Sequence, residues 1–206
     1  MEDLRFEMTR EGPVEAIYLS EQAFLGIILS AAEVYGRECY GLLFGYSLPG
    51  KTIVEGAIAY QTAERKFSQV SLYDRQSKII QKVIGEFPKH AYVGEFHSHP
   101  FFRGWAGDVG LGPEDASGIR EPEVQLVVAI NPRKRSVDWS TNRDGTLSGT
   151  LAGFHFRFGA YRILPAAVEA EAKPRKRGRG RKAKPQMERA RVFCPYAVGL
   201  NPGGGE

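Results

Sequence analysis

The chain has 206 residues, is poor in cysteine and has no long apolar segment. Only Cys39 and Cys194 are present, which excludes a disulfide framework and is compatible with a reducing cytoplasm. No apolar run approaches the roughly 20 residues that cross a bilayer, and the acidic, polar start of the chain is unlike a signal peptide. We therefore expect a cytoplasmic protein with no membrane partner.

The net charge of +4 is divided unevenly along the chain. Residues 165–206 carry ten Lys and Arg but four Asp and Glu, whereas residues 1–164 carry 18 basic and 20 acidic side chains. This division predicts one folded domain over residues 12–164 and a disordered basic tail over residues 165–206. An apolar island at 192–198 is the part of this tail with the composition to dock on the domain or on a partner.

Within the tail, residues 173–185 are similar to an AT-hook, although Gly180 stands where that motif has a proline. A solvated linker and non-specific contact with nucleic acid both remain open, and the second would depend strongly on salt.

Hydrophobic periodicity predicts the secondary structure of the domain. Apolar residues recur at helical spacing over 21–35 and 74–87, and Ser20 is placed to cap the first helix. Strand patterns occupy 14–19, 38–46, 52–60, 91–97, 125–130, 137–141 and 148–158, the last two joined by a turn at 142–145. Strands interleaved with helices predict an α/β (α+β) domain, a mixed sheet flanked by helices.

The segment His97-Ser-His-Pro100 is the most informative for chemistry. Residues two apart on a strand point the same way, so His97 and His99 bring two imidazoles to one place. A catalytic zinc site uses three protein ligands and a water, so a third ligand is needed. Asp115, at the start of a predicted helix, and Asp108, within a glycine-rich loop, are the candidates.

Hydrolysis at such a site also needs a general base beside the water. Glu38 precedes a buried apolar strand, where a charge is costly unless it has a task or a partner. Glu95 shares the strand face of His97 and His99 and is the alternative base. A zinc deaminase is excluded, because that chemistry needs His-x-Glu and Pro-Cys-x-x-Cys.

Together, Glu38-Cys-Tyr-Gly, His97-Ser-His-Pro and Gly112-Pro-Glu-Asp resemble the JAMM motif of the MPN-domain (JAB/Mov34-type) metallopeptidases. The resemblance implies an MPN/JAB-like fold, zinc held by His97, His99 and Asp115, and Glu38 as the acid and base. It further implies hydrolysis of a peptide or isopeptide bond at the C-terminus of a ubiquitin-like or sulfur-carrier protein. We expect that tail to add as a strand along a sheet edge.

The sequence departs from the family pattern in two ways. The interval from His99 to Asp115 is five positions longer than is usual in the family, and the extra residues fall in a loop that contains Trp105. Gly112 occupies the place of a serine that helps to hold the oxyanion, a loss that can cost about 10²–10³ in rate. Ser98, Ser117 or a backbone N–H is the expected substitute. An inactive MPN-type scaffold and a protein that binds nucleic acid through its tail are the alternative functions.

Four further residues are expected to lie outside the catalytic set. Cys39 is expected in the core, Trp105 either to pin the loop or to touch substrate, and His90 and His155 to be incidental.

Overall fold

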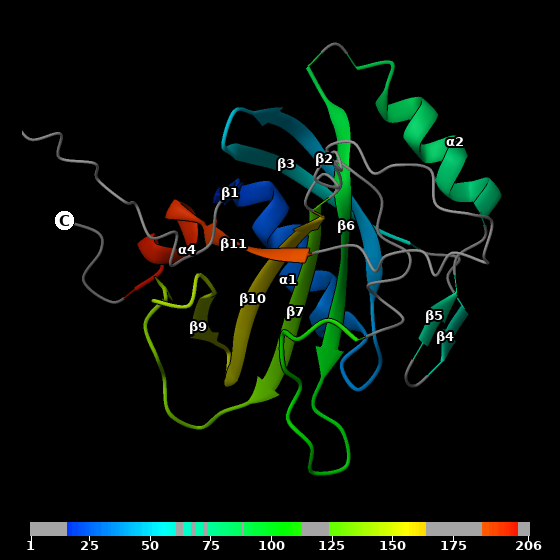
Figure 1. The fold of residues 1–206 in the computed structure, drawn as a ribbon. Helices are drawn as coiled ribbons and strands as arrows, with labels where there is room; N and C mark the ends of the chain where they lie inside the picture. Colours follow the sequence, from blue (N-terminus) through cyan, green and yellow to red (C-terminus); the bar gives the residue numbers. More distant parts are fainter. Residues whose placement is uncertain are drawn as a thin grey trace, which may run out of the picture.

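The computed structural model describes residues 16–60, 64–66, 69–71, 74–87, 89–112, 124–163 and 187–201 (Figure 1). Its helices are α1 (Glu21–Glu33), α2 (Asp74–Ile84) and α4 (Pro195–Gly199). Its strands are β1 (Ala16–Leu19), β2 (Tyr40–Leu48), β3 (Lys51–Ala59), β4 (Glu64–Lys66), β5 (Gln69–Ser71), β6 (Ala91–Pro100), β7 (Val124–Pro132), β8 (Ser140–Thr141), β9 (Leu147–Leu151), β10 (Phe154–Ile163) and β11 (Met187–Phe193).

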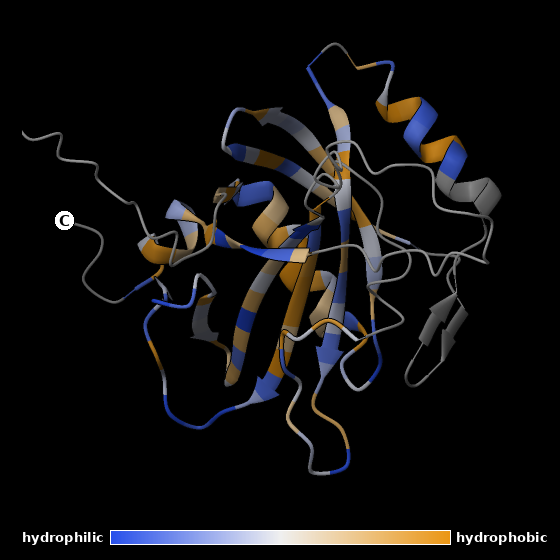
Figure 2. Cartoon of the chain, in the orientation of Figure 1, coloured by the Kyte–Doolittle hydropathy of each residue, from blue (hydrophilic) through white to orange (hydrophobic). Residues whose placement is uncertain are grey.

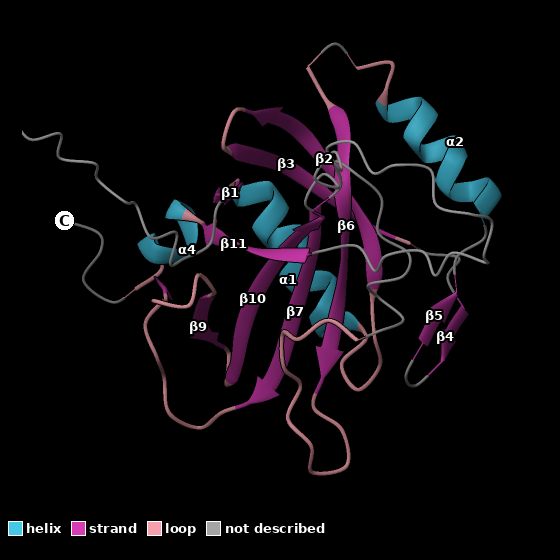
Figure 3. Cartoon of the chain, in the orientation of Figure 1, coloured by secondary structure: helices cyan, strands magenta, loops and turns pink. Residues whose placement is uncertain are grey.

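Nine strands form one sheet in the order β11-β1-β3-β2-β6-β7-β10-β9-β8, and β4 pairs with β5 separately. An additional pairing of β11 with β10 closes the first seven strands into a ring, while β9 and β8 branch from β10. The pairs β1–β11, β1–β3 and β6–β7 are parallel, and the other pairs are antiparallel. Strands dominate the described residues (Figure 3).

The predicted fold class, an α/β (α+β) MPN/JAB-like mixed sheet flanked by helices, is wrong. The sheet is a closed seven-stranded barrel, and its hydrophobic core contains residues from all seven ring strands together with Phe24, Ile27 and Ile28 of α1. The main helix therefore packs against the inside of the curved sheet, behind β7 and β10 in Figure 1, instead of covering an outer face. Periodicity in the sequence identifies such elements but does not say whether a sheet closes.

The start of α1 is formed as its sequence predicts. The backbone N–H of Ala23 donates to Ser20 Oγ at 3.1 Å, which satisfies one of the open donors of the first turn. The same hydroxyl donates to the carbonyl of Glu55 at 2.7 Å and so ties the helix to β3. Within the described part of the chain, no helix is both long and apolar enough to cross a membrane.

Strand β11 corrects the prediction of a disordered tail over residues 165–206. Its residues 191–193 pair with β1 and residues 187–190 with β10, and α4 follows and packs near α1. Ala190 and Val192 are buried while Arg191 is exposed, so the strand alternates between core and solvent. The average composition of residues 165–206 is strongly basic, so it does not reveal this alternation. The AT-hook-like residues 173–185 lie outside the described residues.

The predicted strand over 148–158 is two strands with a tight turn between them. Ala152 (φ 49°) and Gly153 (φ 81°) occupy the left-handed region, and β9 pairs with β10 across them. Alanine is uncommon at such a φ, so its presence concealed the turn that glycine alone marks weakly. The turn also fastens β7, because Arg133 N–H donates to the carbonyl of Gly153 at 2.8 Å.

Strand β7 is buried on both faces and lies beside β6, the strand that contains His97 and His99. It is hydrophobic over most of its length, as Figure 2 shows, with polar residues near its two ends, Gln125 and Asn131. Its parallel register sets His97 beside Val127 and His99 beside Ala129. The outward face of the sheet therefore includes His97 and His99 of β6 and, next to them, Val127 and Ala129 of β7.

Candidate functional site

The two predicted histidine ligands lie together on the outer face of β6. Phe96, just before His97, and Ser98, between the two histidines, are fully buried on the opposite face. His97 is 5% exposed, His99 is half-buried, and their ring centroids are 4.9 Å apart. Strand alternation thus brings the two imidazoles to one place, as their spacing predicts.

A backbone carbonyl fixes the tautomer of His99. The Nδ1 atom lies 2.8 Å from the carbonyl oxygen of Asp108. Because a carbonyl oxygen only accepts, Nδ1 carries the proton and Nε2 carries the lone pair in the neutral ring. This is the arrangement that metal-binding histidines commonly have, with one nitrogen donating to a carbonyl and the other available as a ligand.

The glycine-rich loop after β6 is fastened down beside these histidines. The Tyr161 hydroxyl donates to the Val109 carbonyl at 2.6 Å, and Val109 is buried against β7. Between the loop and β6 lies an open pocket of about 490 Å³. Its lining comprises His99, Ala106, Gly107, Asp108, Gly110, Leu111 and Gly112.

Glu38 lies half-buried in the short segment before β2. Tyr40 is paired with His97, and Ser98 N–H donates to the Cys39 carbonyl at 3.0 Å. Glu38 directly precedes Cys39, so the segment that carries the proposed base is held against the strand that carries the two histidines.

Ser98 lies where it cannot face the histidines. It is fully buried, and its Oγ accepts a hydrogen bond from the Cys39 N–H at 2.9 Å. Adjacent residues of a strand point to opposite faces, so a serine between two ligands belongs to the other side. Its observed task is to hold the Glu38–Cys39 segment against β6, and we do not assign it the oxyanion.

The two candidate third ligands have different outcomes. Asp115 lies outside the described residues, so its prediction as a zinc ligand stays a prediction. Asp108 is exposed, and its Oδ1 accepts from the Gly110 N–H at 2.6 Å within its own loop. Among the described residues, no group of three His, Cys, Asp or Glu side chains is arranged to hold a metal.

Glu95, the alternative base, is held by its neighbours on the outer face. Its Oε2 accepts hydrogen bonds from the Tyr40 hydroxyl and, at 3.1 Å, from Gln125 Nε2. These two donors fix the position of the Glu95 carboxylate on the outer face. Tyr40 and Gln125 are contacts that the sequence analysis missed, although Gln125 is an isolated polar residue in an apolar strand.

No protein-family model and no curated protein sequence matches this chain. Its fold is similar to the solution structure of protein DSY2949 from Desulfitobacterium hafniense. The two chains are 15% identical, with a TM-score of 0.56 over 86% of this chain and 92% of that chain. At this identity the likeness concerns the fold alone.

The four residues that were expected to lie outside the catalytic set are located as follows. Cys39 is 1% exposed in the core, as predicted, and Trp105 is 79% exposed at the tip of the loop. His90 Nε2 lies 2.6 Å from Glu55 Oε2, away from the site. Burial, with the charges of Arg133 and Arg157, lowers the pKa of His155.

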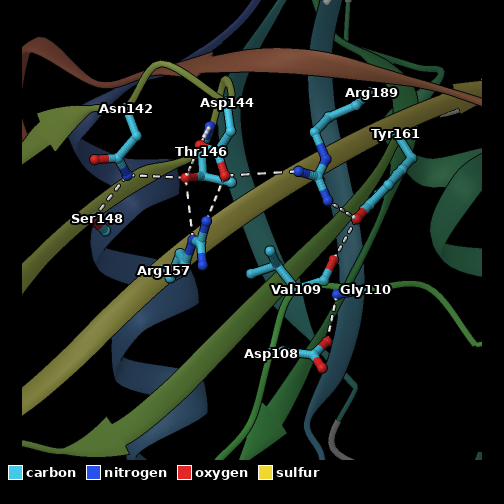
Figure 4. A network of polar contacts seen from close by, with 10 residues as sticks. All are labelled: Asp108, Val109, Gly110, Asn142, Asp144, Thr146, Ser148, Arg157, Tyr161 and Arg189. Atoms are coloured by element: carbon cyan, nitrogen blue, oxygen red, sulfur yellow. Dashed lines mark hydrogen bonds and ion pairs between the residues drawn. The ribbon is translucent and has the colours of Figure 1, made fainter.

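A network of polar contacts connects the loop to the closing strand (Figure 4). The Tyr161 hydroxyl that holds Val109 accepts from Arg189 Nη2 of β11 at 2.9 Å. Arg189 in turn lies near Asp144, whose carboxylate also binds Arg157 of β10. Asp144 therefore joins strands β10 and β11 at the place where the ring closes.

Asp144 should make the fold sensitive to acid. Partial burial tends to raise its pKa, but hydrogen bonds from Thr146 and the charge of Arg157 outweigh this and hold the pKa below its usual value. The charged carboxylate therefore stabilises the native state above the unfolded pKa of about 4, and this contribution is lost as the pH falls through the native pKa. Asp144→Asn should flatten the fall in stability below that pH in urea titrations.

The effect of Asp144→Asn at neutral pH should be about 1 kcal/mol or less, because both Asp144 and Arg157 are more than a third exposed. Asp138→Asn is the matched control, since Asp138 is exposed and makes no ion pair among the described residues. An unchanged acid limb in Asp144→Asn would contradict the role of this carboxylate.

Proposed function

We propose that the protein is a zinc-dependent peptidase or isopeptidase. The observation that carries the proposal is the pair of imidazoles on one face of β6, with the Nε2 lone pair of His99 set by the Asp108 carbonyl. Neutral imidazole nitrogens and a carboxylate are a common donor set for catalytic zinc, and Asp115 is the proposed third ligand. The two imidazoles are donors of the kind that zinc takes, and Asp115, outside the described residues, would have to complete the set.

The residues divide the chemical work as follows. Zinc supplies Lewis acidity, which makes a water acidic enough to attack near neutral pH and polarises the scissile carbonyl. Glu38 accepts the proton of the attacking water and returns it to the leaving amine. His97, almost fully buried, holds its place by packing, and His99 holds its place through the loop. Glu95 holds the side chain of Tyr40, the residue paired with His97, through a hydrogen bond from the Tyr40 hydroxyl.

The pocket beside His99 favours a substrate with an extended, slender main chain. Three of its seven lining residues are glycines, which expose backbone groups and leave room for close approach. β6 is paired on both sides, with β2 and β7, so the tail has no free edge there to join as a strand. We propose that a Gly-Gly tail of a ubiquitin-like or sulfur-carrier protein lies in this pocket instead. The cytoplasm, where thiols such as Cys39 and Cys194 stay reduced, is the proposed location.

The test is metal content together with cleavage. The purified full chain should hold stoichiometric zinc and cleave a ubiquitin-like protein fused through its Gly-Gly tail, and a chelator should abolish cleavage. His97→Ala and His99→Ala should each lose zinc, whereas His90→Ala, away from the site, should keep it. A folded protein that never holds zinc would favour the inactive scaffold, and cleavage that survives the chelator would sink the proposal.

A further inference from the structure

The loop beside the site is pinned to the barrel by the side chain of Asn131. Asn131 Oδ1 accepts from the Gly107 N–H at 2.8 Å, and Asn131 Nδ2 donates to the Gly107 carbonyl at 2.9 Å. Two bonds from one planar amide to both polar groups of one residue fix the peptide units on either side of it. The Asp108 carbonyl, which binds His99, belongs to the next residue.

The loop also has little freedom to move relative to β6 at this point. A Cβ atom on Gly107 would lie 2.0 Å from the carbonyl oxygen of His99, so the two backbones are in direct contact. Phe101 N–H donates to the Ile130 carbonyl at 3.0 Å, next to Asn131 in sequence. The segment from residue 101 to residue 107 is therefore held at both ends by residues 130 and 131 of β7.

The position of Asn131 suits a distant support. Its outward side follows from the register, because His99 pairs with Ala129 and side chains two apart on β7 share a face. Across the sheet it is paired with His155 of β10 in the body of the barrel. Asn131 thus transmits the rigidity of a central strand to a loop of small residues.

We infer that Asn131 is a positioning residue, which sets the tautomer of His99 by holding the Asp108 carbonyl against Nδ1. It does not itself line the proposed substrate pocket, and it contacts that lining only through the backbone of Gly107. The consequence for zinc rests on the proposed function, whereas the consequence for the His99 ring does not. Without the amide, the Asp108 carbonyl keeps the support of Tyr161 on its Val109 side only, and the neutral ring gains freedom to place its proton on either nitrogen.

The experiment compares Asn131→Ala with Asn201→Ala. Asn201 makes the same pair of bonds to another backbone, accepting from the Trp139 N–H at 2.6 Å and donating to the Trp139 carbonyl at 2.9 Å. Loss of either amide removes the same number and kind of hydrogen bonds, but only Asn131 lies at the loop. A purely structural role would therefore lower Tm in both variants and change nothing else.

The first readout is the nitrogen spectrum of the histidine rings in the metal-free full chain, at a pH above the histidine range. In the wild type and in Asn201→Ala, His99 should have its proton on Nδ1. In Asn131→Ala it should become a mixture of both tautomers. A His99 spectrum unchanged in a folded Asn131→Ala protein would overturn the inference.

The second readout is zinc affinity by competition with a chelator. Loss of a residue that orients a ligand typically weakens metal binding about 10–100-fold, and we expect a loss of this size in Asn131→Ala only. Asn131→Asp keeps the acceptor and loses the donor, so an intermediate effect on the tautomer should separate the two bonds. If the wild type binds no zinc, the proposed function fails, yet the ring spectra still decide the role of Asn131.

Discussion

Replacing Glu38 by Gln should lower kcat by about 10²–10⁴-fold, the usual contribution of a general acid or base, while bound zinc is retained. The amide is nearly the same size as the carboxylate, so the half-buried position before β2 should tolerate it. It cannot accept the proton of water, and the proton that leaves with the amine must then come from solvent. KM should change little, because in the proposed function the substrate is held by the pocket and the loop, which this change leaves intact.

Two matched variants make this result specific. Glu33→Gln changes an exposed carboxylate at the end of α1 and should leave kcat unchanged. Glu95→Gln tests the alternative base, and we expect a smaller loss through Tyr40 and Gln125. Full loss in Glu95→Gln with activity intact in Glu38→Gln would reverse the assignment. The rates should be measured by single turnover with metal content checked for each variant.

Local rules of sequence predicted the parts of this site that depend on one strand. The i, i+2 spacing of His97 and His99 was enough to place both rings on one face, and the structure confirms it. The same alternation excludes Ser98 from that face, and the sequence already contained this information. The motif resemblance led us to expect Ser98 at the oxyanion, a role that is incompatible with the face of the strand on which Ser98 lies.

The contacts that orient the proposed ligand His99 and its loop depend on distant residues, so the sequence did not reveal them. The Asp108 carbonyl acts through its backbone, and no choice of side chain at residue 108 signals it. Asn131 and Tyr161 reach the loop from strands β7 and β10, which pair with each other only in the folded barrel. Asn131 and Gln125 did leave a weak signal, as lone polar residues in an apolar strand.

The closing of the barrel escaped prediction for a different reason. A strand with one solvated face needs an apolar residue only at every second position. In β11 these are Ala190 and Val192, which alternate with Arg189 and Arg191 at the end of a strongly basic segment. Composition predicts disorder for that region, while pairing with β1 and β10 supplies the backbone partners that composition does not consider.

Val192→Asp should therefore unfold the domain, although residue 192 lies 28 positions beyond the boundary that composition predicts. Val192 is fully buried, its N–H donates to the Gly145 carbonyl at 2.8 Å, and its carbonyl accepts from Thr141 Oγ1 at 2.8 Å. A carboxylate there would be buried in the core that β11 shares with α1. We expect a loss of more than about 4 kcal/mol, a large part of the stability of a typical domain.

Arg191→Asp is the control, because it puts the same carboxylate on the neighbouring, exposed side of β11. Arg191 packs its guanidinium 5.5 Å from the ring centroid of Phe193, so this change should cost about 1 kcal/mol or less. Truncation after residue 163 should act like Val192→Asp, since both leave β1 and β10 without the strand that joins them. Urea unfolding and amide exchange on β1 and β10 would measure the difference. A truncated chain with wild-type stability would mean that β11 is dispensable and that the barrel does not need to close.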